Sequence, residues 1–192
     1  MKTAYIIHGW DGSPNEPMHK WLKKSLEDLG YMVVAPIMPE SEIPRIDSWV
    51  GKLKEIVKPD QATISIGHSI GCQAILRYLE TLPTTVKIPF VIMIAPWMDL
   101  DRQTLKEEGE EAIEIAKPWI ETLINFDEVK KRAENFVAIF SDNDYCVPLN
   151  QKELFKEKLA AKIIIEHNQG HFTAADKVKK LPSALSAVSQ SK

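Results

Sequence analysis

The chain has 192 residues, of which 44% are hydrophobic and 27% are charged, and its formal net charge is -3. This length supports one sizeable hydrophobic core and is short for two, so we expect a single domain over residues 1–192. The weak negative charge, and the lack of lysine or arginine runs interleaved with aromatic residues, argue against nucleic-acid binding.

The cysteine content and the hydropathy pattern bear on the compartment. Cys72 and Cys146 are the only cysteines, which fits free thiols in a reducing compartment better than a disulfide framework. The apolar run at residues 4–7 meets His8 too early for the hydrophobic region of a secretory signal. No stretch approaches the roughly 20 apolar residues of a membrane span. We therefore expect a cytoplasmic protein without a membrane span.

The first half of the chain alternates between strand-like and helix-like segments. Short β-prone runs end at turn residues, and apolar side chains at helical spacing follow each of them. The predicted strands cover residues 4–8, 31–37 and 63–67, and the predicted helices cover residues 18–29, 46–57 and 70–79.

The second half continues this alternation after one interruption. Residues 90–95 are continuously apolar, as in a strand covered on both faces, whereas residues 98–126 are more charged and predict an insertion of short helices. Pro148 is a favoured first residue of a helix. The further predicted strands cover residues 136–140 and 163–166, the predicted helices cover residues 127–134 and a segment beginning at Pro148, and a mixed helix precedes a frayed tail over residues 183–192.

This order of elements predicts the fold class. Strands that alternate with helices form a parallel sheet with helices on both faces. We expect a three-layer α/β fold of about six parallel strands with no large cap. Ligands of such sheets bind beyond the carboxyl ends of the strands.

Residues Gly67-His68-Ser69-Ile70-Gly71 join a predicted strand to a predicted helix. The pattern predicts a nucleophile elbow, in which a serine is held in a strained turn and the flanking glycines avoid collisions. The start of the following helix would direct its free N–H groups toward whatever Ser69 attacks. Ser69 is therefore the candidate nucleophile.

A serine hydroxyl needs a base within hydrogen-bonding distance and usually an acid to orient that base. Of the five histidines, His68 lies inside the elbow, His19 on a predicted helix, and His8 at a strand end where it would structure the loop. His167 and His171 remain, in the loop after the last strand. His171 is the favoured base, because the preceding Gly170 leaves its backbone free to adopt an unusual conformation in this loop. His167 is the alternative. Their four-residue spacing would suit a metal only in a helix, so we expect no metal site and no cofactor.

The loop after the fifth predicted strand supplies the acid. Asp144 lies just before the helix expected at Pro148, and Asp142 is the alternative, with capping of the same loop as its other role. The order Ser69, Asp144, His171 is the order of an α/β-hydrolase.

Two backbone N–H groups are candidates for the oxyanion hole. One is that of Ile70, directly after the nucleophile. The other is that of Trp10, in the loop after the first strand, where Gly9 allows close approach of the backbone.

Five short segments together resemble a known family. They are His8-Gly9-Trp10, Met38-Pro39, residues 67–71, Ser141-Asp142-Asn143-Asp144 and Gly170-His171-Phe172. The chain is similar over nearly its whole length to the compact α/β-hydrolases that include retinoblastoma-binding protein nine and its bacterial relatives. The resemblance implies a serine hydrolase with little or no lid, and it matches Ser69, Asp144 and His171 to the family triad. The chain lacks a Leu-x-Cys-x-Glu segment, so partnership with pocket proteins is not implied.

Candidate walls of the substrate pocket follow strand ends or lie in the insertion. They are Gly9, Trp10, Trp97, Met98 and Trp119. A place in the core is the alternative for these side chains, and for Trp119 the two are equal. Cys72 is expected to pack behind the elbow.

The prediction is a serine hydrolase that cleaves a small to medium apolar carboxylic ester through an acyl-enzyme on Ser69. Amide and thioester cleavage use the same residues. The alternatives are a catalytically weak protein-interaction module and a non-hydrolytic enzyme of this fold, such as a lyase or a haloperoxidase-like enzyme. The expected partner is a small ester-like molecule, and the sequence names no protein partner.

Overall fold

The computed structural model describes residues 1–189 of the chain, and its strands form one sheet. The sheet has six strands, all paired in parallel, in the order β2-β1-β3-β4-β5-β6. The strands are β1 (Thr3–Ile7), β2 (Met32–Val34), β3 (Thr63–His68), β4 (Ile88–Ile94), β5 (Ala133–Ser141) and β6 (Lys162–Glu166). The α/β-hydrolase-like fold expected from the sequence is confirmed.

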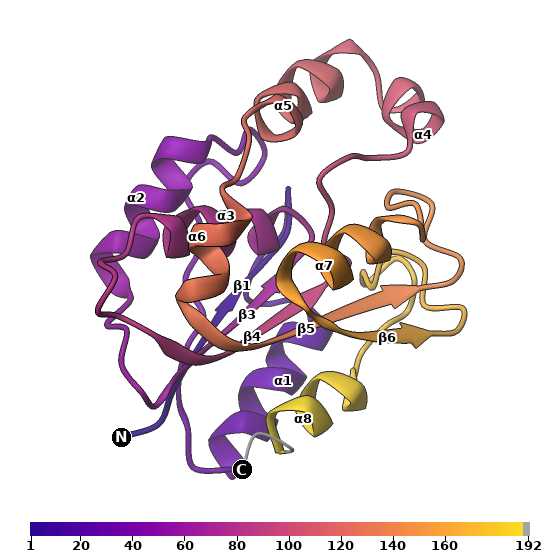
Figure 1. Cartoon of the computed structure of the whole chain (residues 1–192). Helices are drawn as coiled ribbons and strands as arrows, with labels where there is room; N and C mark the ends of the chain where they lie inside the picture. Colours follow the sequence, from indigo (N-terminus) through magenta and orange to yellow (C-terminus); the bar gives the residue numbers. More distant parts are fainter. Residues whose placement is uncertain (190–192) are drawn as a thin grey trace.

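The helices cover both faces of this sheet (Figure 1). They are α1 (Pro17–Asp28), α2 (Ile46–Ile56), α3 (Ile70–Glu80), α4 (Arg102–Glu107), α5 (Glu110–Glu121), α6 (Phe126–Lys131), α7 (Gln151–Leu159) and α8 (Pro182–Ser189). Helices α1 and α8 lie together on one face, and α2, α3, α6 and α7 form a row on the other. Strand β1 lies between β2 and β3, so the chain winds in one direction from β1 to β2 and in the other direction from β3 onward. Ligands of doubly wound sheets bind where the winding direction reverses.

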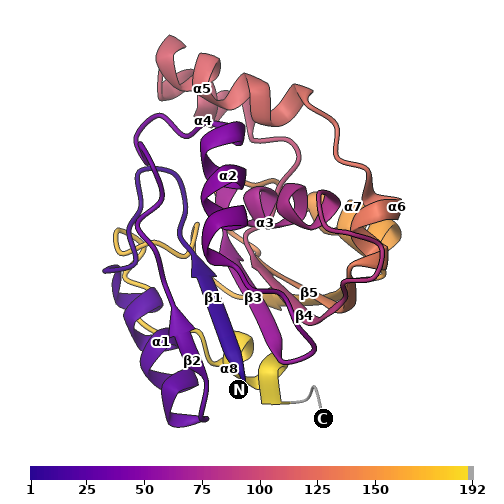
Figure 2. The same ribbon diagram turned by 90° about the vertical axis from the view of Figure 1, so that its left-hand side faces the viewer.

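The register brings the carboxyl ends of the central strands to one level. Ile7 of β1 pairs with Gly67 of β3, and His68 of β3 pairs with Ile94 of β4, which in turn pairs with Ile139 of β5. The loops after these strands therefore gather at one edge. Helices α4 and α5 lie beyond this edge, above the ends of β1 and β3 (Figure 2).

Burial follows the position of each strand in the sheet. Every residue of β1 and β3 is buried, whereas β2 and β6 at the two edges are partly exposed. Strands covered on both faces need apolar side chains at successive positions, which explains the continuous apolar run in β4. Among residues 1–189, no helix is both long enough and apolar enough to cross a membrane.

Several predicted boundaries were wrong. The helix expected over residues 127–134 ends at Lys131, because strand β5 already begins at Ala133. Strand β2 ends at Val34 rather than at residue 37, because Pro36 has no N–H to continue the ladder. Helix α7 begins at Gln151 rather than at Pro148, because Pro148 opens a turn in which its carbonyl accepts from the N–H of Gln151. The expected frayed tail contains α8, whose Ala184 packs into the core, and residues 190–192 lie outside the described part.

Candidate active site

Ser69 lies in the turn between β3 and α3, in a conformation that L-residues rarely adopt. Its φ is 52° and its ψ is -122°. A Cβ on Gly67 would lie 2.7 Å from the backbone nitrogen of Cys72, and one on Gly71 would lie 2.5 Å from the carbonyl oxygen of His8. Both contacts are with backbone atoms, so a side chain at either position would force the turn apart. The two glycines are therefore a steric requirement of the elbow.

Ser69, His171 and Asp144 form one hydrogen-bonded chain. His171 Nε2 lies 2.9 Å from Ser69 Oγ, and His171 Nδ1 lies 2.9 Å and 3.1 Å from the two carboxylate oxygens of Asp144. Since the carboxylate accepts the proton of Nδ1, the lone pair of Nε2 faces the serine hydroxyl. Asp144 also accepts from the backbone N–H groups of Cys146 and Val147, at 2.8 Å and 2.9 Å. These bonds fix the carboxylate in place.

The backbone of His171 is held on both sides. Its N–H donates to Asp176 Oδ2 at 3.0 Å, and its carbonyl accepts from His68 Nε2 at 2.9 Å. The preceding Gly170 has a φ of 52°, and a Cβ there would collide with the carboxylate of Asp176. The bond from His68 joins the elbow directly to the base, a contact across 103 residues that the sequence pattern does not reveal.

The alternative acid and base pair with each other. The carboxylate of Asp142 bonds to the ring of His167 and also accepts from the N–H of Asn168 at 2.9 Å. These bonds lower the pKa of the Asp142 carboxyl, and Asp142 raises the pKa of the His167 imidazole. Asp142 thus caps its loop, and the hydrogen bonds favour Asp144 and His171 as partners of Ser69.

The two backbone N–H groups that are candidates for the oxyanion hole have no hydrogen-bond acceptor within the described residues. Within residues 1–189, neither the N–H of Trp10 nor that of Ile70 is hydrogen-bonded to a protein acceptor. The Trp10 indole is fixed separately, by donation to the carbonyl of Glu42 at 2.8 Å. Backbone donors without an internal partner are free to bind a ligand oxygen.

A cavity of about 660 Å³ opens over Ser69 and His171. Gly9, Trp10 and Trp97 line it, as expected for all three. The insertion contributes further apolar and polar walls that the sequence did not identify, because its periodicity is weak. These are Leu100, Thr104, Leu105 and Ala112.

Two predicted wall residues do not line this cavity. Trp119 is fully buried, donates to the carbonyl of Pro44 at 2.9 Å and packs edge-on against Trp49. The indole N–H of Trp119 has its hydrogen-bond acceptor in the core, so the assignment of Trp119 to the pocket wall was wrong. Met98 is held through its backbone N–H, which donates to Gln151 Oε1 at 3.0 Å, and it packs against the core instead.

Trp97 contacts the candidate nucleophile directly. Its indole Nε1 donates to Ser69 Oγ at 3.2 Å, and the ring is 1% exposed. The chain reaches this position through Ala95, whose φ is 47°. Ser69 Oγ therefore accepts one hydrogen bond from Trp97 while its own proton is available to His171.

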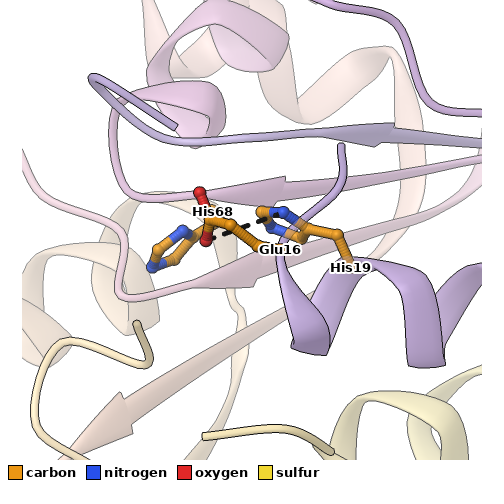
Figure 3. A group of neighbouring side chains, drawn as sticks. All are labelled: Glu16, His19 and His68. Atoms are coloured by element: carbon orange, nitrogen blue, oxygen red, sulfur yellow. Dashed lines mark ion pairs between the residues drawn. The ribbon is translucent and has the colours of Figure 1, made fainter. Parts of the chain in front are cut away.

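Among residues 1–189, two groups of three potential metal ligands have donor atoms within 4.8 Å of one another. In the first, Asp144 and His171 are bonded to each other, and burial raises the pKa of the Cys146 thiol to about 12, so the thiol is protonated. In the second, the Glu16 carboxylate lies between the rings of His19 and His68 (Figure 3). Burial lowers the pKa of both imidazoles, which are therefore neutral.

The hydrogen bonds of the second group decide what it can hold. His19 Nδ1 lies 3.9 Å from Glu16 Oε2, but it lies 3.0 Å from the carbonyl of Ser13, to which only a protonated nitrogen can bond. A protonated nitrogen cannot ligate a metal. With this tautomer, His19 Nδ1 is not a ligand, and the lone pair lies on Nε2, which is buried without a hydrogen-bond partner among residues 1–189. The second group therefore offers a carboxylate and two unpaired imidazole nitrogens, His19 Nε2 and His68 Nδ1.

Two known proteins are similar to this chain over most of its length. YdeN of Bacillus subtilis, which is named as a hydrolase, is 26% identical over 183 residues, covering 94% of this chain and 91% of YdeN. The serine hydrolase RBBP9 of Rattus norvegicus is 26% identical over 166 residues, covering 86% of this chain and 78% of that protein.

Solved structures share the fold. The crystal structure of the ydeN gene product superposes with a TM-score of 0.88 at 24% identity, over 100% of this chain and 98% of that one. An esterase of Pyrococcus furiosus superposes with a TM-score of 0.56 at 19% identity, over 86% of this chain and 71% of the esterase. The family described as serine hydrolase matches residues 4–190. This chain belongs to the serine hydrolase family.

Proposed function

We propose that this serine hydrolase cleaves carboxylic esters through an acyl-enzyme on Ser69, with His171 as base and Asp144 as the acid that orients it. The observation that carries the proposal is the continuous hydrogen-bonded chain from Ser69 Oγ through His171 to the Asp144 carboxylate. It lies beside a cavity large enough for a small ester and its alcohol.

The chemistry proceeds in two halves. Ser69 Oγ attacks the ester carbonyl carbon while its proton moves to His171 Nε2, and the carbonyl oxygen becomes an oxyanion. Collapse breaks the bond to the alcohol, which leaves with the proton from Nε2. Water then repeats the sequence on the acyl-enzyme and releases the carboxylic acid. Asp144 keeps the proton on Nδ1, so Nε2 is the basic nitrogen throughout.

The free N–H groups of Trp10 and Ile70 are the proposed oxyanion donors. Trp10 directly follows Gly9 and Ile70 directly follows Ser69, and both Gly9 and Ser69 line the cavity. One such donor typically stabilises a transition state by about 2.7 to 4 kcal/mol.

The walls of the cavity favour a small to medium apolar group. Trp10, Trp97, Leu100 and Leu105 are among its apolar lining residues. Amides and thioesters pass through the same intermediate, so their relative rates report the leaving group that the site accommodates.

Hydrolysis of p-nitrophenyl acetate and butanoate by the purified chain tests this proposal. We expect turnover that falls by several orders of magnitude in Ser69→Ala. Ser65→Ala is the matched control, because Ser65 lies in β3, the strand that leads to Ser69, and it does not line the cavity. Equal activity of Ser69→Ala and the wild type would contradict the proposal, and so would a complete lack of esterase activity.

A further inference from the structure

We propose that the inner end of the active-site cavity binds a protonated amine of the substrate, between the Glu16 carboxylate and the unpaired ring nitrogen of His68. The inference rests on the proposed function, since it names the class of ester that the same cavity accepts. The substrate would carry an alkylammonium group on its acyl or its alcohol part.

The charge of the cavity favours a cation. Its lining includes four carboxylic acids, Asp11, Glu16, Asp101 and Glu108, and within the described chain it includes no lysine or arginine. A cavity lined by charges of one sign focuses their field on a ligand. The site therefore attracts cationic esters and repels esters that carry a carboxylate or a phosphate.

Glu16 is the acid with the least compensated charge close to the elbow. One carboxylate oxygen, Oε1, accepts from the N–H of Ser13 at 3.0 Å. The one ion-pair contact of Glu16 among residues 1–189 is His19 at 3.9 Å, and burial keeps that imidazole neutral. Oε2 therefore carries negative charge without a cationic partner, on a side chain that is 22% exposed.

His68 supplies a second acceptor at the same place. Its Nε2 donates to the carbonyl of His171, so its Nδ1 holds a lone pair. This nitrogen is buried, without a hydrogen-bond partner, in a residue that is 3% exposed and lines the cavity. A buried polar atom without a partner is costly, and a ligand that donates a proton to it removes that cost.

The backbones of two glycines lie directly against these acceptors. A Cβ on Gly9 would lie 3.2 Å from His68 Nδ1 and 3.4 Å from Ser69 Cβ, and one on Gly12 would lie 2.7 Å from Glu16 Oε1. The lone pair of His68 and the candidate nucleophile thus flank the same glycine. An ammonium group bound here belongs to a molecule short enough to reach Ser69.

The acceptors of this cluster match an alkylammonium ion. Its three N–H donors match the Glu16 carboxylate, the lone pair of His68 Nδ1 and the lone pair of His19 Nε2. His19 Nδ1 donates its proton to the carbonyl of Ser13, so Nε2 is an acceptor, and within the described chain it is buried without a hydrogen-bond partner. The rings of Trp10 and Tyr145 line the same cavity and offer faces that attract cations.

Pairs of esters that differ only by ammonium against methyl test the proposal. On the acyl side, the p-nitrophenyl ester of 3-aminopropanoate is compared with the butanoate. On the alcohol side, 2-aminoethyl butanoate is compared with propyl butanoate. We expect kcat/KM to favour the ammonium ester of at least one pair by about 10-fold or more, the size of a charge-assisted hydrogen bond.

Glu16→Gln removes the charge and keeps an acceptor for the N–H of Ser13. We expect it to abolish the preference for the ammonium ester, whereas Glu27→Gln, an equivalent change on the exposed surface of α1, leaves the preference at its wild-type value. Hydrolysis without discrimination in either pair, or a preference that survives in Glu16→Gln, would overturn the inference and leave the esterase proposal standing.

A binding measurement separates the subsite from turnover. In Ser69→Ala, butylammonium should shift the NMR signals of the His68 and His19 rings, and 1-butanol at the same concentration should not. The shift should disappear when Glu16→Gln is added. Absence of the shift would overturn the inference even for an active enzyme. Stoichiometric binding of Zn²⁺ that is lost in His19→Phe would overturn it in favour of a metal site.

Discussion

At the scale of single residues, the hydroxyl of Ser69 lies between two buried partners with opposite roles. His171 Nε2 is positioned to take its proton, and Trp97 Nε1 donates to its oxygen at 3.2 Å. A donor on the oxygen holds Oγ in the rotamer that faces the base, and it stabilises the negative charge that Oγ carries as an acyl group leaves. Trp97 is therefore a positioning residue for the proposed nucleophile.

Replacement of Trp97 by phenylalanine removes this donor and keeps an aromatic ring. We expect kcat/KM for p-nitrophenyl butanoate to fall about 10-fold, which is the value of one neutral hydrogen bond. The measurement is steady-state kinetics, with unfolding followed in parallel to confirm that the fold persists. Trp21→Phe on α1 is the control, because Trp21 does not line the cavity. Wild-type kinetics in Trp97→Phe would show that the bond has no part in turnover.

Single residues also show what the sequence could and could not predict. The sequence could predict that Ser69, Asp144 and His171 come together, because each lies in the loop after a predicted strand and the three occur in a known order. Their hydrogen bonds agree with this, and their role in catalysis stays a prediction. The donor role of Trp97 and the bond from His68 to the His171 carbonyl depend on how distant loops meet. The spacing of residues along the chain does not predict such contacts. For the same reason, the sequence could not decide between the pocket wall and the core for Trp119, which is buried in the core.

At the scale of elements, an arginine of helix α3 links the insertion to the helices that cover the sheet. Arg77 of α3 is 5% exposed and donates to the carbonyls of Trp119 and Thr122 at 3.0 Å and 2.7 Å. These carbonyls lie at the end of α5, where helical carbonyls lack internal partners. The positive charge of Arg77 is also favourable at a helix carboxyl end. Arg77 thus caps α5 and orients the insertion over the cavity.

Arg77→Met keeps the apolar stem of the side chain and removes the donors. We expect the free energy of unfolding to fall by about 3 kcal/mol, because two buried carbonyls lose their partner. The measurement is urea denaturation, with limited proteolysis of the α4–α5 segment. Arg102→Met, an exposed arginine of α4, should change stability by less than about 0.5 kcal/mol. Equal stability of the two variants would contradict this role for Arg77.

The elements themselves were predictable to different degrees. The existence of the inner strands β1, β3, β4 and β5 was predictable, because burial on both faces requires runs of mostly apolar residues. The first residues of β5 include the exposed Glu134 and Asn135, which break this pattern, so its start at Ala133 was not predicted. The sequence predicts a frayed tail where α8 lies, because the serines and alanines of this segment give only a weak helical periodicity of apolar residues. The helix is stabilised by packing against the core, which local sequence does not reveal.

At the scale of the whole molecule, one sheet gathers the reactive groups. Trp10, Ser69, Trp97, Asp144 and His171 each follow a different strand, from β1, β3, β4, β5 and β6. Because the strands are parallel and their carboxyl ends are level, five loops meet over one cavity. Several histidines lie buried in the same region, and their burial links folding to protonation.

Stability should decline as the pH falls from 7.5 to 5.5. Burial lowers the pKa of His8, His19 and His68 in the folded chain, so the unfolded chain binds more protons around and below the ordinary value of about 6.5. Each such group contributes stability that is complete above that value and is lost as the pH falls, by at most about 1.4 kcal/mol per pH unit. Urea denaturation at several pH values measures this dependence.

His19→Phe tests the assignment of this dependence. The variant should show a shallower decline than the wild type, because one lowered pKa is gone. The pKa of exposed His167 is raised by Asp142, so its contribution has the opposite sign and His167→Gln should steepen the decline. A wild-type stability that is constant from pH 7.5 to 5.5 would contradict the buried neutral histidines.

The most direct test of the account is labelling by a fluorophosphonate, followed by peptide mapping, in the wild type, Asp144→Asn and His171→Ala. We predict that the label attaches to Ser69 in the wild type. Labelling should be slower by several orders of magnitude in each variant, and the double variant should be no slower than the slower single one, because the groups act as a unit. A label on another residue, or equal labelling rates in all proteins, would contradict the account.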